Sequence, residues 1–183
     1  MKLLRTIRLD PSDTFVFERA AGPGEWAISG AFRFADADAE VLSGRALAAF
    51  RSGFMGLQTF GWSTLVQIVE ATEVDRAGLV DTLAQYFLTD VGAPDLTAAR
   101  AAAEDEVAFA ASLCDHPADT LVAVHRRFED GAIREAFRTL HPRGERKPMR
   151  AFTFLDVDGE DEPGETVDLA RLATAAKPQG TDR

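Results

Sequence analysis

Alternation of apolar and polar residues predicts β-strands in the first third of the chain. Segment 26–34 alternates cleanly, and segments 2–9, 14–19 and 59–70 are also expected to be strands from their apolar, β-branched and aromatic residues. The loop at 20–25 contains glycine and proline, so segments 14–19 and 26–34 are expected to form a hairpin with an inward aromatic face. Segment 59–70 has apolar residues on both of its faces, which is typical of a central strand buried on both sides.

Helical spacing of apolar residues predicts three further elements. The first helix is expected at about 37–51, where Gly53 is placed to end it in a left-handed conformation. The second opens with a capping-box pattern at residues 72–75 and closes near Gly92. The third covers about 93–113 and is rich in alanine, which has the highest helix propensity.

The C-terminal half returns to a strand pattern at residues 120–128. Apolar residues in 133–140 fall at helical spacing, so a short helix is favoured there over a hairpin strand. A final strand is expected at 149–157, and the acidic, polar segment 159–183 is expected to form a partly disordered tail. Together these elements predict a single α+β domain at 1–158, in which a mostly antiparallel sheet of five or six strands packs against three to four helices.

Composition supports a folded protein without a membrane segment. The chain has 183 residues, of which 46% are hydrophobic and 27% charged, and this fits one domain of ordinary globular type. No run approaches the roughly 18 apolar residues that a membrane helix needs, and Arg5 and Arg8 interrupt any signal-peptide core. The single Cys114 excludes an internal disulfide framework and suits a reducing compartment. The sequence therefore predicts a cytoplasmic protein with no membrane partner.

Charge is negative overall but uneven along the chain. The formal net charge of −10 argues against nucleic-acid binding, which needs a basic surface. Residues 125–150 contain eight Arg or Lys against four Asp or Glu, a net charge of +4, so the remainder carries −14. Two interpretations stay open: the basic segment is neutralised within the fold, or it binds an anionic ligand or partner.

The motifs of common catalytic and cofactor sites are absent from the sequence. It contains no GxxxxGK[ST], GxGxxG, GxSxG, CxxC or HExxH pattern. With one cysteine and three histidines, a structural zinc site would need carboxylates to complete it. Cys114 and His116 lie two residues apart at a predicted helix end, where a structural role is favoured over a nucleophile–base pair. We expect no cofactor, no metal and no catalytic set.

A group of basic residues in and after the strand expected at 120–128 is the first candidate binding site. Strand alternation places His125 and Arg127 on one face, where they could hold a carboxylate or phosphate. Arg134 and Arg138, one helical turn apart in the predicted helix, could extend this group. The alternative is a polar strand face that simply meets water.

An aromatic and glycine-rich stretch at residues 50–64 is the second candidate. It concentrates three Phe, one Trp and three Gly. Its bulky rings, with Trp62 at the centre, either fill the core or form the wall of an apolar pocket on which a planar ligand stacks.

Segments 1–10, 26–34 and 60–64 together resemble a family of uncharacterised conserved bacterial proteins. The resemblance would cover most of the chain, and it implies no activity, cofactor or catalytic residue. The leading hypothesis is therefore a non-catalytic cytoplasmic binding or accessory protein, with a second copy of itself or another protein as partner. The alternative is a small-molecule enzyme or carrier that holds an anionic ligand through His125 and Arg127 beside Trp62.

Overall fold

One antiparallel sheet organises the fold, and its eight described strands follow the spatial order β4-β3-β2-β1-β5-β6-β7-β8. The computed structural model describes residues 1–37, 41–142 and 155–157. The strands are β1 (Lys2–Ile7), β2 (Trp26–Ile28), β3 (Phe54–Gly56), β4 (Trp62–Ser63), β5 (Leu65–Glu70), β6 (Leu121–Glu129), β7 (Ala132–Pro142) and β8 (Leu155–Val157). The predicted α+β class with an antiparallel sheet is confirmed, but the number of strands is higher than the five or six expected.

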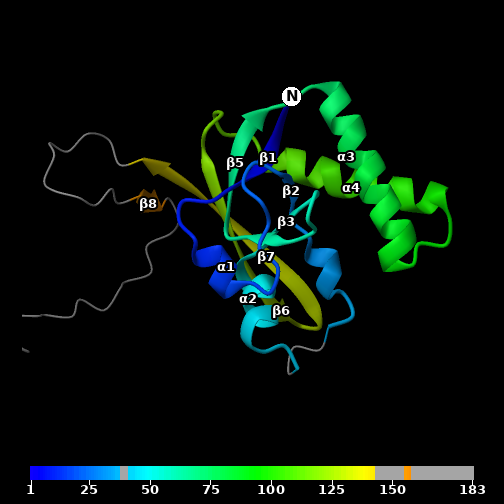
Figure 1. Ribbon diagram of the computed structural model, residues 1–183, viewed down its shortest axis with the longest axis horizontal. Helices are drawn as coiled ribbons and strands as arrows, with labels where there is room; N and C mark the ends of the chain where they lie inside the picture. The colour runs from blue at the N-terminus through cyan, green and yellow to red at the C-terminus, as the bar shows by residue number, and fades with distance from the viewer. Residues whose placement is uncertain (38–40, 143–154, 158–183) are drawn as a thin grey trace, which may run out of the picture.

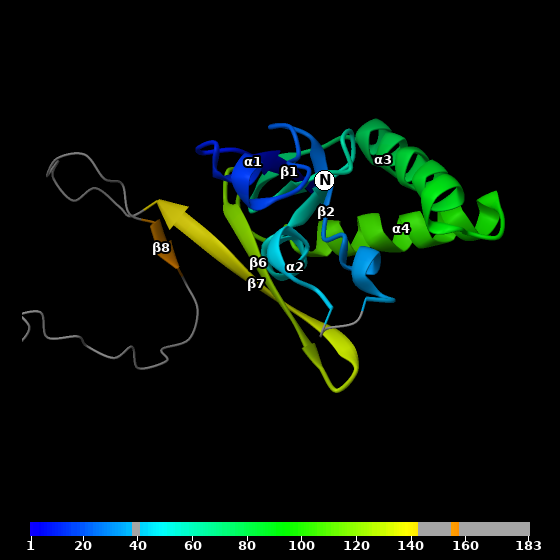
Figure 2. The same cartoon turned by 60° about the horizontal axis from the view of Figure 1, so that its bottom comes forward.

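Helices pack on the sheet in two groups, which Figure 1 and Figure 2 show well apart. The described helices are α1 (Ser12–Val16), α2 (Gly44–Ser52), α3 (Glu73–Tyr86) and α4 (Leu96–Ser112), with a 3₁₀ turn η1 (Ala31–Phe34) and a π-helical turn η2 (Phe87–Val91). Helices α3 and α4 pack on each other, and α4 also contacts β1 and β2. Helix α2 lies near α1 and packs against β6.

Small residues on α4 allow it to lie close to the sheet and to α3. The buried positions of α4 are spaced by three or four residues, as one face of a helix requires: Ala99, Ala103, Val107 and Ala110. They belong to the main core together with Leu3 and Leu4 of β1 and Leu83 of α3, all of which are 1% exposed or less. This core holds the sheet and the α3–α4 pair together.

Local signals predicted several elements correctly. The strand expected at 2–9 is β1, the strand at 120–128 is β6, and the two later helices are α3 and α4. The capping box is present, because Thr72 Oγ1 accepts from the Asp75 amide at 3.1 Å and the Asp75 carboxylate accepts from the Thr72 amide at 2.9 Å. Gly92 follows η2 in the left-handed conformation, with φ of 88°.

The two strands expected at 14–19 and 26–34 are largely wrong. Residues 12–16 form helix α1, whose buried Asp13 accepts hydrogen bonds from Ser63 and Thr64 instead of facing a turn. Strand β2 ends at Ile28, since Gly30 takes a φ of 75° and turns the chain into η1.

The helix expected at 37–51 begins only at Gly44, and Gly53 does not end it in a left-handed conformation. Gly53 has φ of −96° and ψ of 130°, so α2 passes directly into β3. The strand expected at 59–70 is divided into β4 and β5, because Phe60 adopts a positive φ of 51° and the chain breaks again at Thr64.

The short helix expected at 133–140 is wrong, because this segment is strand β7. It pairs with β6 along its length, from Leu121 opposite Leu140 to Glu129 opposite Ala132. The connecting residues Asp130 and Gly131 have φ of 51° and 75°, as the favoured two-residue hairpin turn requires. In the expected final strand only residues 155–157 are described, as β8, and the predicted tail at 159–183 lies outside the described residues.

Candidate functional site

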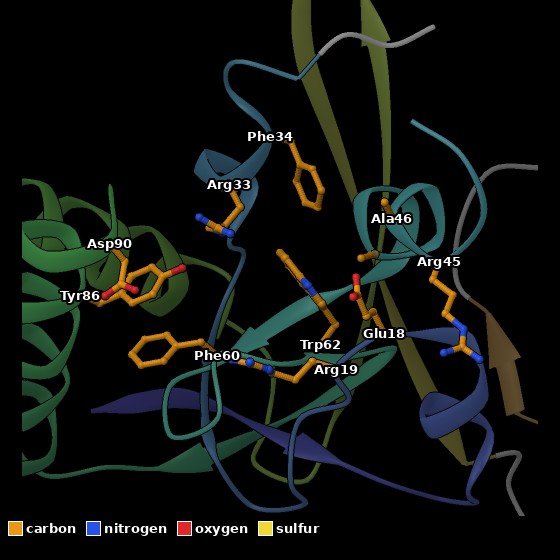
Figure 3. Close-up of a pocket in the computed structure, with 11 residues that line it drawn as sticks. Glu18, Arg19, Arg33, Phe34, Arg45, Ala46, Phe60, Trp62, Tyr86 and Asp90 are labelled. Carbon is orange, nitrogen blue, oxygen red and sulfur yellow. The ribbon is translucent and has the colours of Figure 1, made fainter. Parts of the chain in front are cut away.

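A cleft of about 810 Å³ lies beside Trp62 (Figure 3). Segments far apart in the sequence build it: the bend after α1, η1, α2, the loop before β4 with the start of β4, and the α3–η2 junction. Its lining residues are Glu18, Arg19, Arg33, Phe34, Arg45, Ala46, Ala49, Phe60, Trp62, Tyr86 and Asp90. The cleft therefore exists only in the folded protein.

Four aromatic rings form the apolar wall of the cleft. The Trp62 ring lies 5.2 Å from Phe34, and Phe60 stacks on Tyr86 with 4.1 Å between ring centroids and an interplanar angle of 12°. Figure 3 shows Trp62 at the centre of this group, between Phe34 and Phe60. Such a wall offers flat surface on which a planar molecule can stack.

Two glycines fix the position of the Trp62 ring. A Cβ atom on Gly53 would lie 2.8 Å from Trp62 Cε3 and 2.8 Å from the Ala49 carbonyl oxygen. A Cβ atom on Gly30 would lie 3.1 Å from Trp62 Cζ3. All three distances are shorter than ordinary contacts, so only glycine lets the backbone approach the indole this closely. The tryptophan is thus held rigidly at the boundary between the core and the cleft.

A buried carboxylate holds the loop that carries Phe60. Glu25 is 3% exposed, and its Oε2 accepts from the Gln58 amide at 3.0 Å and from the Thr59 amide at 2.9 Å. Thr59 Oγ1 in turn accepts from the Gly61 amide at 3.1 Å. These bonds surround Phe60, whose φ of 51° is rare for a bulky residue. Strain of this kind persists where the surrounding structure imposes it, and it is frequent at binding sites.

Three arginines surround the aromatic wall. Arg19, Arg33 and Arg45 are exposed, and none of them forms an ion pair within 4.0 Å of a carboxylate in the described part of the chain. The Arg33 guanidinium lies 5.9 Å from the centre of the Tyr86 ring. Glu18 and Asp90 also line the cleft, which leaves it with one excess positive charge. Arg19 already donates to the Thr59 carbonyl oxygen at 3.3 Å, and the other donors of the three planar guanidinium groups can bind an anionic group.

The site residues predicted from the sequence lie in two separate places, the cleft and the β6–β7 hairpin. Trp62 lines the cleft, as one of its two interpretations proposed. The register sets Arg127 opposite Arg134, His125 opposite Ala136 and Arg138 opposite Ala123, so all four basic residues share one face of the β6–β7 hairpin. They are exposed and do not line the cleft, and Arg127 pairs with Glu129 at 2.8 Å. The structure therefore does not bring His125 and Arg127 beside Trp62.

Arg126 lies on the face of β6 opposite to His125 and Arg127. It is buried, and the sequence did not predict a role for it. Its side chain has no exposed area, and its Nε atom lies 2.7 Å from Glu135 Oε1. Burial lowers the pKa of the Arg126 guanidinium, while the negative charge of Glu135 raises it. The guanidinium also donates to the carbonyl oxygens of Gly53 at 2.7 Å, Phe50 at 3.1 Å and Ser29 at 2.5 Å.

The hydrogen bonds of Arg126 hold the segments that pack against Trp62. They join β6 and β7 to the end of α2 and to the segment after β2. Those segments carry Gly53 and Gly30, which contact Trp62. Strand alternation places Arg126 on the same face as Val122 and Val124, and that was the one signal in the sequence for its burial.

The described residues contain little other reactive chemistry. Cys114 is 3% exposed, its thiol donates to the Ala110 carbonyl, and burial raises its pKa to about 11. A thiol with that pKa is protonated near neutral pH and is a poor nucleophile. No group of three or more described His, Cys, Asp or Glu side chains is arranged to hold a metal ion. None of the described helices is long and apolar enough to cross a membrane.

The chain belongs to DUF6505, a family of unknown function, and the match covers residues 1–155. The expected relationship to an uncharacterised family is thus confirmed, and the matched region contains every residue that lines the cleft. No curated protein matches the chain. No solved structure matches it either. The function must therefore be argued from the site itself.

Proposed function

We propose that this protein binds, without chemical conversion, a small molecule that combines a planar ring with an anionic group. One observation carries the proposal: three arginines without a carboxylate partner surround a wall of four aromatic rings. The ring of the ligand stacks on Trp62 and its neighbours, and its carboxylate or phosphate accepts hydrogen bonds from the arginines. The cleft volume of about 810 Å³ lies within the range typical of small-molecule sites.

A binding role without catalysis fits the side chains of the cleft. Its eleven described lining residues include no histidine, cysteine, serine or lysine, so carboxylates and the Tyr86 hydroxyl are the groups among them that could serve as nucleophile or base. The two carboxylates, Glu18 and Asp90, are exposed. Their negative charge disfavours polyanions, so a ligand with one or two negative charges suits the cleft best.

The basic face of the β6–β7 hairpin supports a second candidate role. His125, Arg127, Arg134 and Arg138 project from the same exposed face, away from the side that carries Arg126. An acidic protein partner or a second copy of this chain is the occupant that such a face would attract. We also propose that the protein is cytoplasmic and that it forms a dimer.

Ligand-induced thermal stabilisation tests the cleft proposal. We expect indole-3-acetate and adenosine monophosphate to raise the melting temperature, and their neutral analogues indole-3-ethanol and adenosine to raise it less. A ligand that binds only the folded state stabilises it in proportion to its affinity. Substitution of Arg33 or Arg45 by alanine should weaken binding by about 10- to 100-fold, the effect of losing one charge-assisted hydrogen bond.

Arg138→Ala is the matched control for these substitutions. It removes the same charged group from the exposed face of β7, outside the cleft. We expect it to leave the affinity for both anions within about twofold of the wild type, because screening weakens charge effects over such distances. Equal loss of affinity in Arg138→Ala and Arg33→Ala would show that only overall charge matters, and the cleft proposal would then be rejected.

A further inference from the structure

A second cavity, of about 450 Å³, is lined by residues that neighbour those of the cleft in the chain. Its described lining residues are Phe32, Phe87, Val91, Gly92, Ala93, Ala102, Asp105 and Glu106. Turn η1 contributes Phe32 to this cavity and Arg33 to the cleft. At the α3–η2 junction, Phe87 lines this cavity and Tyr86 lines the cleft. The Phe32 and Phe87 rings meet edge to face, with 4.8 Å between centroids. This second cavity is therefore apolar over most of its wall.

The charge of this cavity is opposite to that of the cleft. Asp105 and Glu106 are the two ionisable groups among its described lining residues, and none of these residues is basic. Both belong to α4, and the helix positions Glu106 so that its Oε2 atom is buried without a hydrogen-bond partner in the described part of the chain. A buried acceptor without a donor is unfavourable, because it has lost its hydrogen bonds to water and gained none in the protein. An unsatisfied acceptor thus lies in the wall of the cavity, on a residue that lines it.

The surroundings of Glu106 make its charged form unfavourable. Burial raises the pKa of Glu106 to about 7, and the negative charges of Glu135 on β7 and Asp105 on α4 act in the same direction. Arg126 on β6 opposes them but is already engaged by Glu135 and three backbone carbonyls. A positive charge that enters the cavity would favour the ionised carboxylate.

We propose that this cavity binds a small organic cation, a primary ammonium group on a short apolar body, with the Glu106 carboxylate as its counter-ion. The ammonium group would donate to Glu106 Oε2 and supply the hydrogen bond that this atom lacks. The apolar body would pack on Val91 and Ala93, and the Phe32 and Phe87 rings would attract the cation through their negative faces. This site differs from the cleft in ligand charge and does not depend on the proposed function.

Calorimetric titration with hexylammonium at pH 6 and pH 8 tests the site. Below pH 7 the empty site is largely protonated, so the cation must displace a proton from Glu106, whereas above pH 7 the carboxylate is already ionised. The amine itself stays charged at both pH values, as lysine does. We expect roughly tenfold tighter binding at pH 8 than at pH 6, with proton release at pH 6. The neutral analogue 1-hexanol should bind at least tenfold more weakly at pH 8.

Two variants assign the effect to one carboxylate. Glu106→Gln keeps the shape of the side chain and removes its charge, and we expect at least a tenfold loss of hexylammonium affinity at pH 8 together with loss of the pH dependence. Glu104→Gln, two residues away on the exposed side of α4, should bind as the wild type does. Because Glu106→Gln removes an unfavourable buried charge, it should fold at least as stably as the wild type at pH 8. Unchanged affinity in Glu106→Gln, equal affinity for 1-hexanol, or no heat of binding in the wild type would each overturn the proposal.

Discussion

Single glycines decide where the largest ring of the site can lie. Gly53 follows α2, and a Cβ atom at this position would lie 2.8 Å from both the Trp62 ring and the Ala49 carbonyl oxygen. The sequence indicated that glycines beside bulky rings allow close packing, and the structure shows which atoms come close. It did not indicate that Gly53 would be extended, because a helix-ending glycine is more commonly left-handed.

Substitution of Gly53 by alanine should destabilise the fold. The new methyl group would meet a backbone oxygen at 2.8 Å, and backbone cannot move aside as a flexible side chain can. We expect the free energy of unfolding in urea to fall by about 1–3 kcal/mol, as is typical of overpacked sites. Gly78→Ala is the matched control, since nothing lies within 4 Å of the added Cβ in the middle of α3. It should raise stability by about 0.5–1 kcal/mol, and a stabilising Gly53→Ala would contradict the packing described for Trp62.

At the scale of elements, contacts between residues close in sequence could be predicted correctly. A pattern that fits both a helix and a strand led to a wrong prediction. The capping box at Thr72 is a contact between residues three apart, so sequence alone could predict it. Segment 133–140 has apolar residues that fit helical spacing, but Ile133, Glu135 and Phe137 also alternate with outward-facing arginines. The Asp130-Gly131 pair resolves this ambiguity, because aspartate and glycine suit a two-residue hairpin turn. Alternation together with that turn would have predicted β7.

A buried ion pair inside the β6–β7 hairpin, Arg126 with Glu135, is part of a network that Arg126 extends to the backbone after β2 and at the end of α2, and substitutions can test it. Arg126→Met should lower the free energy of unfolding by about 3–5 kcal/mol, since it removes the charged partner of Glu135, which keeps the Ser29 hydroxyl as a donor, and leaves three carbonyl oxygens without the guanidinium. The double variant Arg126→Met/Glu135→Gln should be less destabilised than the sum of the two single variants. The exposed pair of Arg127 and Glu129 is the control, and Arg127→Met should change stability by less than about 1 kcal/mol. Similar effects of Arg126→Met and Arg127→Met would contradict the role assigned to the buried network.

At the scale of the whole molecule, the candidate site could not be predicted because no segment contains it. Trp62 could be proposed from its aromatic neighbours in the sequence. Arg19, Arg33 and Arg45 come from three separate segments, and only the packing of η1 and α2 around β4 brings them to one cleft (Figure 3). The basic residues that do cluster in the sequence lie together on the outer face of the hairpin instead.

The two cavities also appear only at this scale. The cleft is lined by three arginines and the second cavity by two carboxylates, with η1 and the α3–η2 junction contributing to both. Net charge, which is −10 for the chain, says nothing of this local division. Binding specificity in this protein is therefore expected to follow the local arrangement of charge and not the overall value.

Fluorescence of Trp62 gives the most direct test of planar-anion binding in the cleft. The chain has two tryptophans, and Trp26 lies outside the cleft with Arg5 over its ring at 3.8 Å, so Trp26→Phe leaves Trp62 as the single reporter. We predict that adenosine monophosphate or 4-hydroxybenzoate changes Trp62 emission saturably, and that the further substitutions Arg33→Ala and Arg45→Ala abolish the change. Emission that stays constant with both anions, or a change that persists without the two arginines, would contradict the proposed function.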